Sequence, residues 1–267
     1  MKVVAVSLDW GLLFKRLFSP DSIFWGALIK TVTIAVVAQF LGVILGLISA
    51  LSGRSRLLPL RALSGVYVWF FRGTPLIVQI FFIYFGANLF VGFDLFPRTI
   101  GILGIGVSGA IVAGTVALSL NEGAFMSEII RAGIGAVDRG QMEAAQSVGM
   151  TRRLAMRRIV LPQAARIIVP PLGNEFNGMI KSTSLLAFIG VYELFLDAEV
   201  GYSTTFKPVE YFVAVAIWYL VLTTIWGFIQ ARIERRLGAS ELEEQEGKAR
   251  FLARLFRPAP DSRGGVR

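Results

Sequence analysis

Apolar residues of this chain fall into five long runs, which are separated by polar and charged links. Residues 99–120 contain no ionisable side chain at all, and an apolar run of more than about 18 residues is typical of a transmembrane helix. Because backbone groups inside lipid have to be hydrogen-bonded within their own segment, runs of this length are predicted to be helices. The predicted spans are 23–51, 63–90, 99–126, 164–188 and 211–233.

Positive charge is distributed unevenly among the links. The links after the first and third spans, and the segment after the fifth, are rich in arginine, whereas the other two links are not. Short loops rich in Lys and Arg lie on the cytoplasmic side, so we predict an outside N-terminus and an inside C-terminus. The same placement accounts for the net charge of +9 without a nucleic-acid partner.

The apolar runs define one membrane domain with two short flanking segments. Residues 1–22 are predicted to be an amphipathic interfacial segment, because their apolar stretches are too short and too often broken by charge for a cleavable signal peptide. Residues 23–237 form the predicted transmembrane domain. Residues 238–267, acidic at first and then basic and rich in Pro and Gly, are predicted to be a disordered cytoplasmic tail.

Several kinds of chemistry are excluded by composition. The chain has no cysteine and no histidine, which removes disulfides, cysteine nucleophiles, thiolate or imidazole metal sites and histidine-based triads. It also lacks the phosphate-binding loop Gly-x4-Gly-Lys-Ser/Thr, whose backbone amides hold a nucleotide. We therefore predict no catalytic residue, no metal site and no cofactor on this chain.

The link between the third and fourth spans has a distinctive local pattern. Residues 143–148 are good helix formers, and Gly149 follows in the position of a helix C′ glycine. Thr151 is placed to cap a second helix over 152–161, which Pro162 is expected to end. The pattern predicts a compact helix-turn-helix whose small-residue surface fits a groove in a partner protein.

This segment resembles the ABC-transporter permease subunits of binding-protein-dependent importers. Their signature is Glu-Ala-Ala, three residues, Gly, nine residues, Ile, one residue and Leu-Pro. The resemblance implies that the segment is the coupling helix that docks on the ATPase subunit, as opposed to an ordinary basic helix on the membrane surface. The matching residues are Glu143, Ala144, Ala145, Gly149, Ile159, Leu161 and Pro162.

The resemblance extends over most of 22–237. Within the family, the chain is similar to the polar amino acid subfamily, whose members import histidine, glutamine, arginine and glutamate. It is carried by the runs 71–76, 120–124, 128–129, 171–176 and 181–185. Two positions depart from the subfamily pattern. Ser182 stands where Asp is frequent, and Glu122 stands where a small residue is frequent.

The fold implied by the resemblance is an all-α membrane protein with five transmembrane helices and a cytoplasmic coupling helix, as in type I ABC importers. Its implied location is the bacterial cytoplasmic (inner) membrane, where the chain is multi-pass. The implied partners are an ABC ATPase dimer that binds the ATP, a second permease copy or paralogue, an extracytoplasmic solute-binding protein, the amino-acid substrate and the lipid bilayer.

Polar residues within a span are costly unless they face a partner or water, so each is a candidate for the substrate pathway. Asn121 and Glu122 lie deep in the third span, with an intersubunit hydrogen bond as the alternative for Glu122. Glu128 lies three residues before Arg131, and the alternative here is a helical salt bridge between the two.

The fourth span carries the densest polar group. Helical spacing places Asn174, Asn177 and Lys181 on one face, beside Glu175, and Pro170-Pro171 is tolerated where a helix lines a cavity. Such groups are suited to the α-carboxylate and α-ammonium of an amino acid, and the alternative is packing between spans in a dimer. The predicted pathway residues are Asn121, Glu122, Glu128, Asn174, Glu175, Asn177, Lys181 and Ser182.

Two other classes of function stay open at this point. One is an ion-coupled secondary transporter of small polar solutes, although a single chain of five spans without a visible repeat fits it poorly. The other is an integral-membrane enzyme, which without His or Cys would depend on carboxylates such as Glu122 or Glu175.

Overall fold

The computed structural model describes residues 8–102 and 104–238, and this part of the chain is helical apart from one hairpin. The elements are α1 (Trp10–Phe18), α2 (Ser22–Gly53), α3 (Leu58–Gly73), α4 (Leu76–Phe81), a π-helical turn η1 (Phe82–Gly86), α5 (Ala87–Val91), β1 (Thr99–Ile102), β2 (Ile105–Ser108), α6 (Gly109–Ala136), α7 (Arg139–Ser147), α8 (Arg152–Ala155), a π-helical turn η2 (Met156–Val160), α9 (Leu161–Ser182), a 3₁₀ helix η3 (Thr183–Ile189), α10 (Leu194–Thr205) and α11 (Pro208–Leu237).

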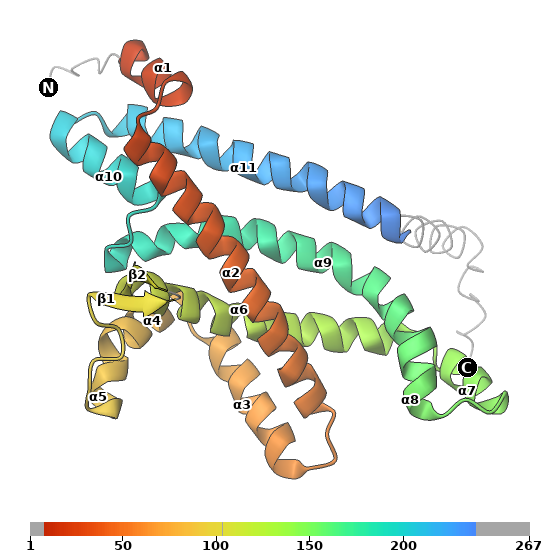
Figure 1. The fold of residues 1–267 in the computed structure, drawn as a ribbon. Coiled ribbons are helices and arrows are strands. Elements are labelled where there is room, and N and C mark those ends of the chain that lie inside the picture. Colours follow the sequence, from red (N-terminus) through yellow and green to blue (C-terminus); the bar gives the residue numbers. More distant parts are fainter. Residues whose placement is uncertain (1–7, 103, 239–267) are drawn as a thin grey trace, which may run out of the picture.

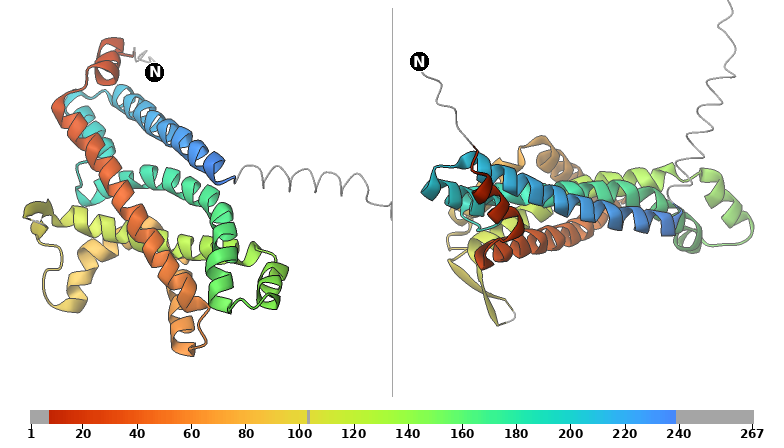
Figure 2. Two further views of the ribbon diagram at one scale, coloured as in Figure 1. Left: turned by 45° about the vertical axis from the view of Figure 1, so that its right-hand side comes forward. Right: turned by 90° about the horizontal axis from the view of Figure 1, so that it is seen from above.

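Four long helices determine the shape of the molecule. Helix α2 crosses α6 obliquely and makes its most extensive contact with it, while α9 contacts both α6 and α11 (Figure 1). Seen from above, the long helices lie in a flat, elongated layer (Figure 2). The largest buried apolar cluster lies where α2, α4, α6 and η3 meet, around Ile34, Ile80, Leu118 and Leu186.

Three helices in the described part, α2, α6 and α11, are each long and apolar enough to cross a membrane. Two further candidates are bent pairs: α3 with 76–86, bent by 111°, and 152–189 with α10, bent by 49°. Counting each pair as one span gives up to five, so the predicted number of five transmembrane helices stays a prediction.

The predicted second span, 63–90, is broken in the structure at Thr74-Pro75. Thr74 adopts an extended conformation (φ −117°, ψ 149°), which is the conformation that a following proline favours. Since Pro75 has no N–H to continue the helix, α3 ends at Gly73 and α4 starts in a new direction.

The predicted third span begins at the wrong residue, and the all-α prediction is wrong at the same place. Residues 99–108 form an antiparallel hairpin whose turn includes Gly104 at φ +81°, and the helix runs from Gly109 to Ala136. The segment is apolar, but its alternating glycine and β-branched residues favour strands over helix. Gly101, Gly104 and Ser108 therefore serve the hairpin and not helix packing.

Pro162 does not end a helix, contrary to the sequence-based expectation. The chain is helical from Arg152 to Ile189, and the π-helical turn η2 ends at Val160, two residues before the proline. A wider turn at this point accommodates the missing N–H and the bulky ring of proline. Helix α10, in the predicted link between the fourth and fifth spans, was also not predicted.

Helix α1 lies within the predicted interfacial segment 1–22, and it packs along α11. Lys207 pairs with Asp9, which caps α1, and Arg16 lies 3.4 Å from a carboxylate oxygen of Asp197 in α10. The position of α1 in a membrane stays a prediction. The tail predicted over 238–267 lies outside the described residues, apart from Gly238.

Glycines permit the close contact between α2 and α6. A Cβ atom at Gly42 would lie 2.5 Å from Cγ of Glu122, and one at Gly46 would overlap Cβ of Met126 and lie 2.9 Å from the backbone nitrogen of Ser127. Gly42 and Gly46 therefore serve close helix packing.

Candidate functional site

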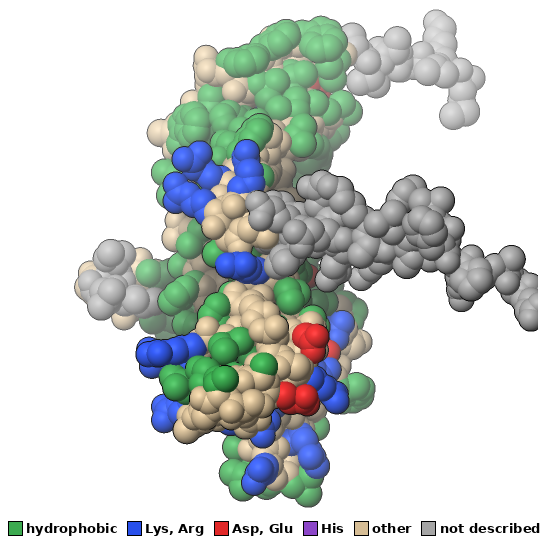
Figure 3. Space-filling model, turned by 90° about the vertical axis from the view of Figure 1, so that its right-hand side faces the viewer, with side chains coloured by type: hydrophobic (Ala, Val, Ile, Leu, Met, Phe, Trp, Pro, Cys, Tyr) green, Lys and Arg blue, Asp and Glu red, His purple; other side chains and the backbone are tan. Residues whose placement is uncertain are grey.

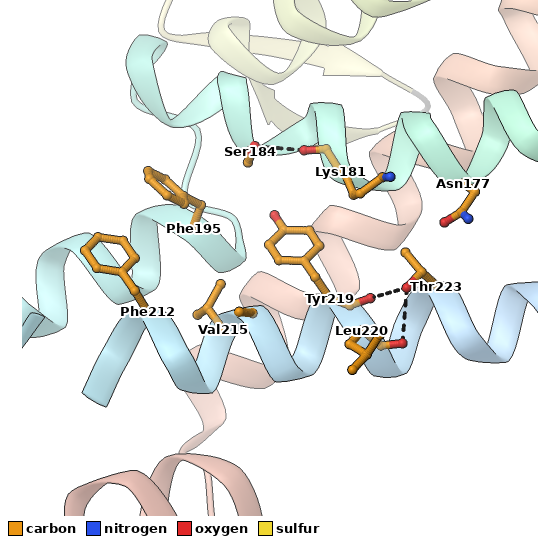
Figure 4. A pocket seen from close by; sticks show the side chains of 10 residues that line it. Asn177, Lys181, Ser184, Phe195, Phe212, Val215, Tyr219, Leu220 and Thr223 are labelled. Carbon is orange, nitrogen blue, oxygen red and sulfur yellow. Dashed lines mark hydrogen bonds between the residues drawn. The ribbon is translucent and has the colours of Figure 1, made fainter. Parts of the chain in front are cut away.

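A cavity of about 560 Å³ lies between α9 and η3 on one side and α10 and α11 on the other. Figure 4 shows Asn177 and Lys181 on α9 facing Tyr219 and Thr223 on α11. Aromatic and aliphatic side chains complete the wall. The remaining lining residues are Ser184, Phe195, Phe212, Val215, Ala216 and Leu220.

The cavity has few polar groups, and they include one cation and one hydrogen-bond acceptor without a donor. Lys181 is its one charged lining residue, and no carboxylate is among them. Oδ1 of Asn177 is buried and accepts no hydrogen bond from any group in the described part of the chain. A buried acceptor without a donor is unfavourable, so this oxygen is available to a donor on a ligand.

Helix α11 presents a polar stripe to α9 that the sequence reasoning missed. Nε1 of Trp226 donates to the carbonyl oxygen of Gly173 at 2.8 Å, and Nε2 of Gln230 donates to that of Pro170 at 3.3 Å. The signal that would have revealed the stripe is the spacing of four, three and four residues within an otherwise apolar span. Its members are Tyr219, Thr223, Trp226 and Gln230.

Glu193 lies beside the cavity and contacts two of its lining residues, Phe195 and Tyr219. Its side chain is fully buried and caps α10, accepting hydrogen bonds from the backbone nitrogens of Phe195 and Leu196 at 2.9 and 3.0 Å. The hydroxyl of Tyr219 donates to the second carboxylate oxygen at 2.8 Å. Glu193 therefore connects α10 and α11 through hydrogen bonds.

Asn121, a predicted pathway residue, holds the corner between α3 and α4. Its Nδ2 donates to the carbonyl oxygen of Phe71 at 3.0 Å and to Oε1 of Gln79 at 2.9 Å. Gln79, which is 3% exposed, in turn donates to the carbonyl oxygens of Phe71 and Thr74. Sequence reasoning missed Gln79, although it is an amide in an apolar stretch four residues after Pro75.

Glu122 lies between α2 and α6 and does not line the cavity. Its carboxylate is 5% exposed and accepts a 2.9 Å hydrogen bond from Nε2 of Gln39. Oε1 of Gln39 accepts no hydrogen bond within the described part of the chain. The hydrogen bond of Glu122 is thus formed within one chain, and the intersubunit hydrogen bond foreseen as its alternative stays a prediction.

Glu128 forms the helical ion pair that was foreseen as its alternative. Oε2 of Glu128 lies 2.6 Å from a guanidinium nitrogen of Arg131 and 3.8 Å from one of Arg72 on α3. The pair lies near the α7 end of α6, away from the cavity. This geometry is that of an interfacial ion pair.

The other predicted residues of α9 divide between its two sides. Asn174 lies toward α11, where Nε2 of Gln230 is 3.5 Å from its Oδ1, so the face predicted for Asn174, Asn177 and Lys181 is confirmed. Glu175 and Ser182 are half-buried and do not line the cavity. The structure thus brings together two of the eight predicted pathway residues, Asn177 and Lys181, in one cavity.

The predicted coupling segment forms the helix-turn-helix that its sequence indicates. Asp138 caps α7 by accepting from the backbone nitrogen of Gly140 at 2.7 Å. Gly149 has φ +85°, and the backbone nitrogen of Met150 donates to the carbonyl oxygen of Ala145, as at a glycine-terminated helix. Oγ1 of Thr151 then caps α8 by accepting from the backbone nitrogen of Leu154 at 3.3 Å.

The end of the molecule that carries this segment is shown in Figure 3, where basic side chains surround a small neutral surface. Glu143, Ala144 and Gly149 are exposed, whereas Ala145 points inward and is 3% exposed. Of the remaining motif residues, Ile159 is half-buried and Leu161 and Pro162 are exposed. Among the described residues, no group of three or more Asp, Glu, His or Cys is placed to hold a metal ion.

Comparison with known proteins gives consistent matches over most of the chain. Relatives include a probable amino-acid permease protein, YxeN, of Bacillus subtilis (41% identical, covering 79% of this chain and 89% of the relative) and the arginine transport system permease protein ArgU of Corynebacterium glutamicum (36% identical, covering 90% and 74%). A crystal structure of an amino acid ABC transporter with histidines matches with a TM-score of 0.74 and 36% identity, covering 86% of this chain and 99% of that chain.

A family model identifies the chain as a whole. Residues 42–239 match the model described as "Binding-protein-dependent transport system inner membrane component". Inward-facing structures of the MetNI methionine ABC transporter, at 17% identity and a TM-score of 0.63, share the fold. The chain therefore belongs to the family of inner-membrane components of binding-protein-dependent transport systems.

Proposed function

We propose that this chain is the permease subunit of an ABC importer that moves polar amino acids into the cytoplasm. Its relatives at 36–41% identity are named as permeases for amino acids or arginine, which supports an amino-acid substrate. The observation that carries the proposal within this chain is the cavity that contains Lys181 and the free Oδ1 of Asn177.

The cavity offers one partner for each charged group that all amino acids share. The ammonium of Lys181 pairs with an α-carboxylate, and the amide oxygen of Asn177 accepts from an α-ammonium. Asn177 and Lys181 are four residues apart, so both groups project from the same face of α9. Tyr219 and Thr223 provide hydroxyls on the opposite wall.

The complete transporter is proposed to contain partners beyond this chain. Two permeases, either identical or paralogous, enclose the path, an ATPase dimer binds and hydrolyses ATP below them, and an extracytoplasmic solute-binding protein delivers the substrate. The arginine-rich links support an orientation with the N-terminus outside, the C-terminus inside and α7 in the cytoplasm. The exposed Glu143-Ala144 surface of α7 supports docking of the ATPase there.

The substrate proposal is tested by cysteine accessibility, which is unambiguous because the native chain has no cysteine. Asn177→Cys and Lys181→Cys are expected to react with a water-soluble thiol reagent, and a transported amino acid is expected to slow the reaction. Phe228→Cys is the control on α11, because Phe228 is 73% exposed and lies outside the cavity lining. Unreactive cysteines at both cavity positions, with uptake intact, would place the path elsewhere.

Docking of the ATPase is tested separately. Gly149→Leu places a bulky side chain at an exposed position with φ +85°, so the turn that follows α7 is expected to rearrange. We expect the variant to insert into the membrane but to lose assembly with the ATPase. Gly178→Ala is a control without a steric clash, since nothing lies within 4 Å of its added Cβ. Normal ATP-driven uptake by Gly149→Leu would contradict the docking assignment.

A further inference from the structure

A groove with basic and apolar walls lies on the surface of α8, η2 and the first turn of α9. It has a volume of about 870 Å³, and we name it the arginine groove. Within the described part of the chain, none of its three arginines has a carboxylate within 4.0 Å, and all three are exposed. Its lining includes Arg152, Arg153, Arg157, Leu154, Met156 and Leu161.

The three arginines are not equivalent. Arg152 also borders a second concavity, whose lining contains both acidic and basic residues (Asp138, Glu143, Arg54 and Arg139). Arg153 and Arg157 border the arginine groove alone and lie four residues apart on one side of the helix. Arg153 and Arg157 are therefore the two residues that we expect to bind a ligand in this groove.

The position of the groove relative to α9 gives its expected depth in a membrane. Helix α9 has 22 residues, and at about 1.5 Å per residue it is ~33 Å long, which matches the ~30 Å hydrocarbon core of a bilayer. The helix continues without interruption from Arg152 into α9 and belongs to one of the two bent candidate spans. With α9 taken as the membrane-crossing part of that span, the groove is expected just outside the hydrocarbon core, at the level of the lipid headgroups.

The chemistry of the lining selects one kind of occupant. Guanidinium groups bind phosphate oxygens with two parallel hydrogen bonds. Leu154 and Leu161 are 38% and 42% exposed beside the arginines, which suits acyl chains and gives no advantage to a soluble phosphate. Basic pockets at the ends of membrane helices attract anionic lipids by about 1 kcal/mol per basic residue. Figure 3 shows that Lys and Arg side chains gather on this end of the molecule.

We propose that the arginine groove binds an anionic phospholipid of the adjacent leaflet. Arg153 and Arg157 hold its phosphate, and its acyl chains run from there along Leu161 toward α9. The site is separate from the cavity that contains Lys181, because the two share no lining residue. The proposal rests on the membrane position of α9 and is independent of the transported substrate.

The test measures lipid retained by the purified full-length chain with native mass spectrometry. The probes are dimyristoyl phosphatidylglycerol and dimyristoyl phosphatidylcholine, which have the same acyl chains and differ in headgroup charge. The unmodified chain is expected to retain the anionic lipid preferentially. Arg153→Gln with Arg157→Gln is expected to weaken that retention about tenfold or more, following from the loss of two basic contacts.

The matched control is Arg232→Gln with Arg236→Gln, which removes two exposed arginines at the same spacing from the end of α11, outside the groove. Each variant is checked for unchanged elution in size-exclusion chromatography. Equal losses of lipid retention in the two double variants would show a general attraction of the anionic lipid to positive charge and would overturn the proposal. If lipid retention rises when residues 241–267 are deleted, the groove is assigned to that segment. If bound lipid is lost when the ATPase is added, the groove is assigned to the ATPase. Either result also overturns the proposal.

Discussion

Two helix junctions of this chain are built on different principles. Between α2 and α6, glycines place one backbone directly against the other helix, and Gly46 leaves no room even for a methyl group. Between α9 and α11, the contact is made by long side chains such as Trp226 and Gln230, and a cavity of about 560 Å³ lies beside it. The first junction is dense, whereas the second contains empty space.

The difference indicates which junction is suited to move. Closely interdigitated helices have a single good packing arrangement and resist sliding. The contact between α9 and α11 instead depends on the side chains of Trp226 and Gln230, which can change rotamer, and a cavity lies beside it. We therefore expect α2 and α6 to act as a fixed unit, and α9 and α11 to change their relative position during transport.

The largest effect is expected at the dense junction. Gly46→Ala introduces a Cβ that overlaps Cβ of Met126 and lies 2.9 Å from the backbone nitrogen of Ser127, so stability is expected to fall by about 3 kcal/mol. Gly26→Ala in the same helix is the control, because nothing lies within 4 Å of its added Cβ. Thermal unfolding in detergent measures both. Equal midpoints for the two variants would show that α2 and α6 separate easily.

A smaller effect is expected at the α9–α11 junction. Trp226→Phe keeps an aromatic ring but removes the N–H that donates to the carbonyl oxygen of Gly173 and part of the packing of the indole, which together cost about 1–2 kcal/mol. Because this contact joins the two helices that we expect to move, the rate of ATP-driven uptake should also change. Trp69→Phe is the matched control, since Trp69 is 74% exposed. An uptake rate identical to that of the control would count against movement at this junction.

Glu122 offers a finer test of the dense junction. In Glu122→Gln the new amide N–H can donate to Oε1 of Gln39, which otherwise lacks a donor, so stability should change by less than about 1 kcal/mol. Glu122→Ala removes the partner of Gln39 altogether and should cost about 2 kcal/mol. Uptake assays in parallel decide whether the charge matters for transport. Uptake that is normal in Glu122→Gln would leave Glu122 with a packing role alone.

The smallest effect is expected outside both junctions, where α1 meets α11. Lys207 holds the pKa of the Asp9 carboxyl below its ordinary value through a hydrogen bond. A lowered pKa means that the contact stabilises the folded chain above the ordinary aspartate pKa of about 4 and is lost as the pH falls through the lowered value. Asp9→Asn keeps the helix cap but removes the charge. Its unfolding midpoint should fall slightly below wild type at pH 7 and match it at low pH; a constant difference would refute the assignment.

The fold was predictable where one local property decides it. The apolar run 23–51 marks α2 to within two residues at each end, and Thr74-Pro75 marks a break because proline acts on its own backbone and on its predecessor. Hydropathy failed at 99–108, since it does not distinguish an apolar strand from an apolar helix. Pro162 was misjudged because the π-helical turn before it is an adjustment of the whole helix.

The candidate site was predictable only within single helices. Asn177 and Lys181 follow from helical spacing along α9, and their shared cavity confirms it. The opposite wall, with Tyr219 and Thr223, depends on how α11 is placed against α9, which no spacing in either helix reveals. Glu122 was assigned to the pathway for the same reason, because its partner Gln39 lies on another helix.

The position of the proline pair within α9 has a mechanical consequence. Pro170 and Pro171 lie near the middle of the 22-residue helix, about 14 Å from Leu161 and about 17 Å from Lys181 at 1.5 Å per residue. Bending at the proline pair divides the helix into two arms of similar length. A bend of roughly 10° shifts one end by roughly 2–3 Å relative to the other arm, so the Lys181 end can change position while the α8 end stays in place.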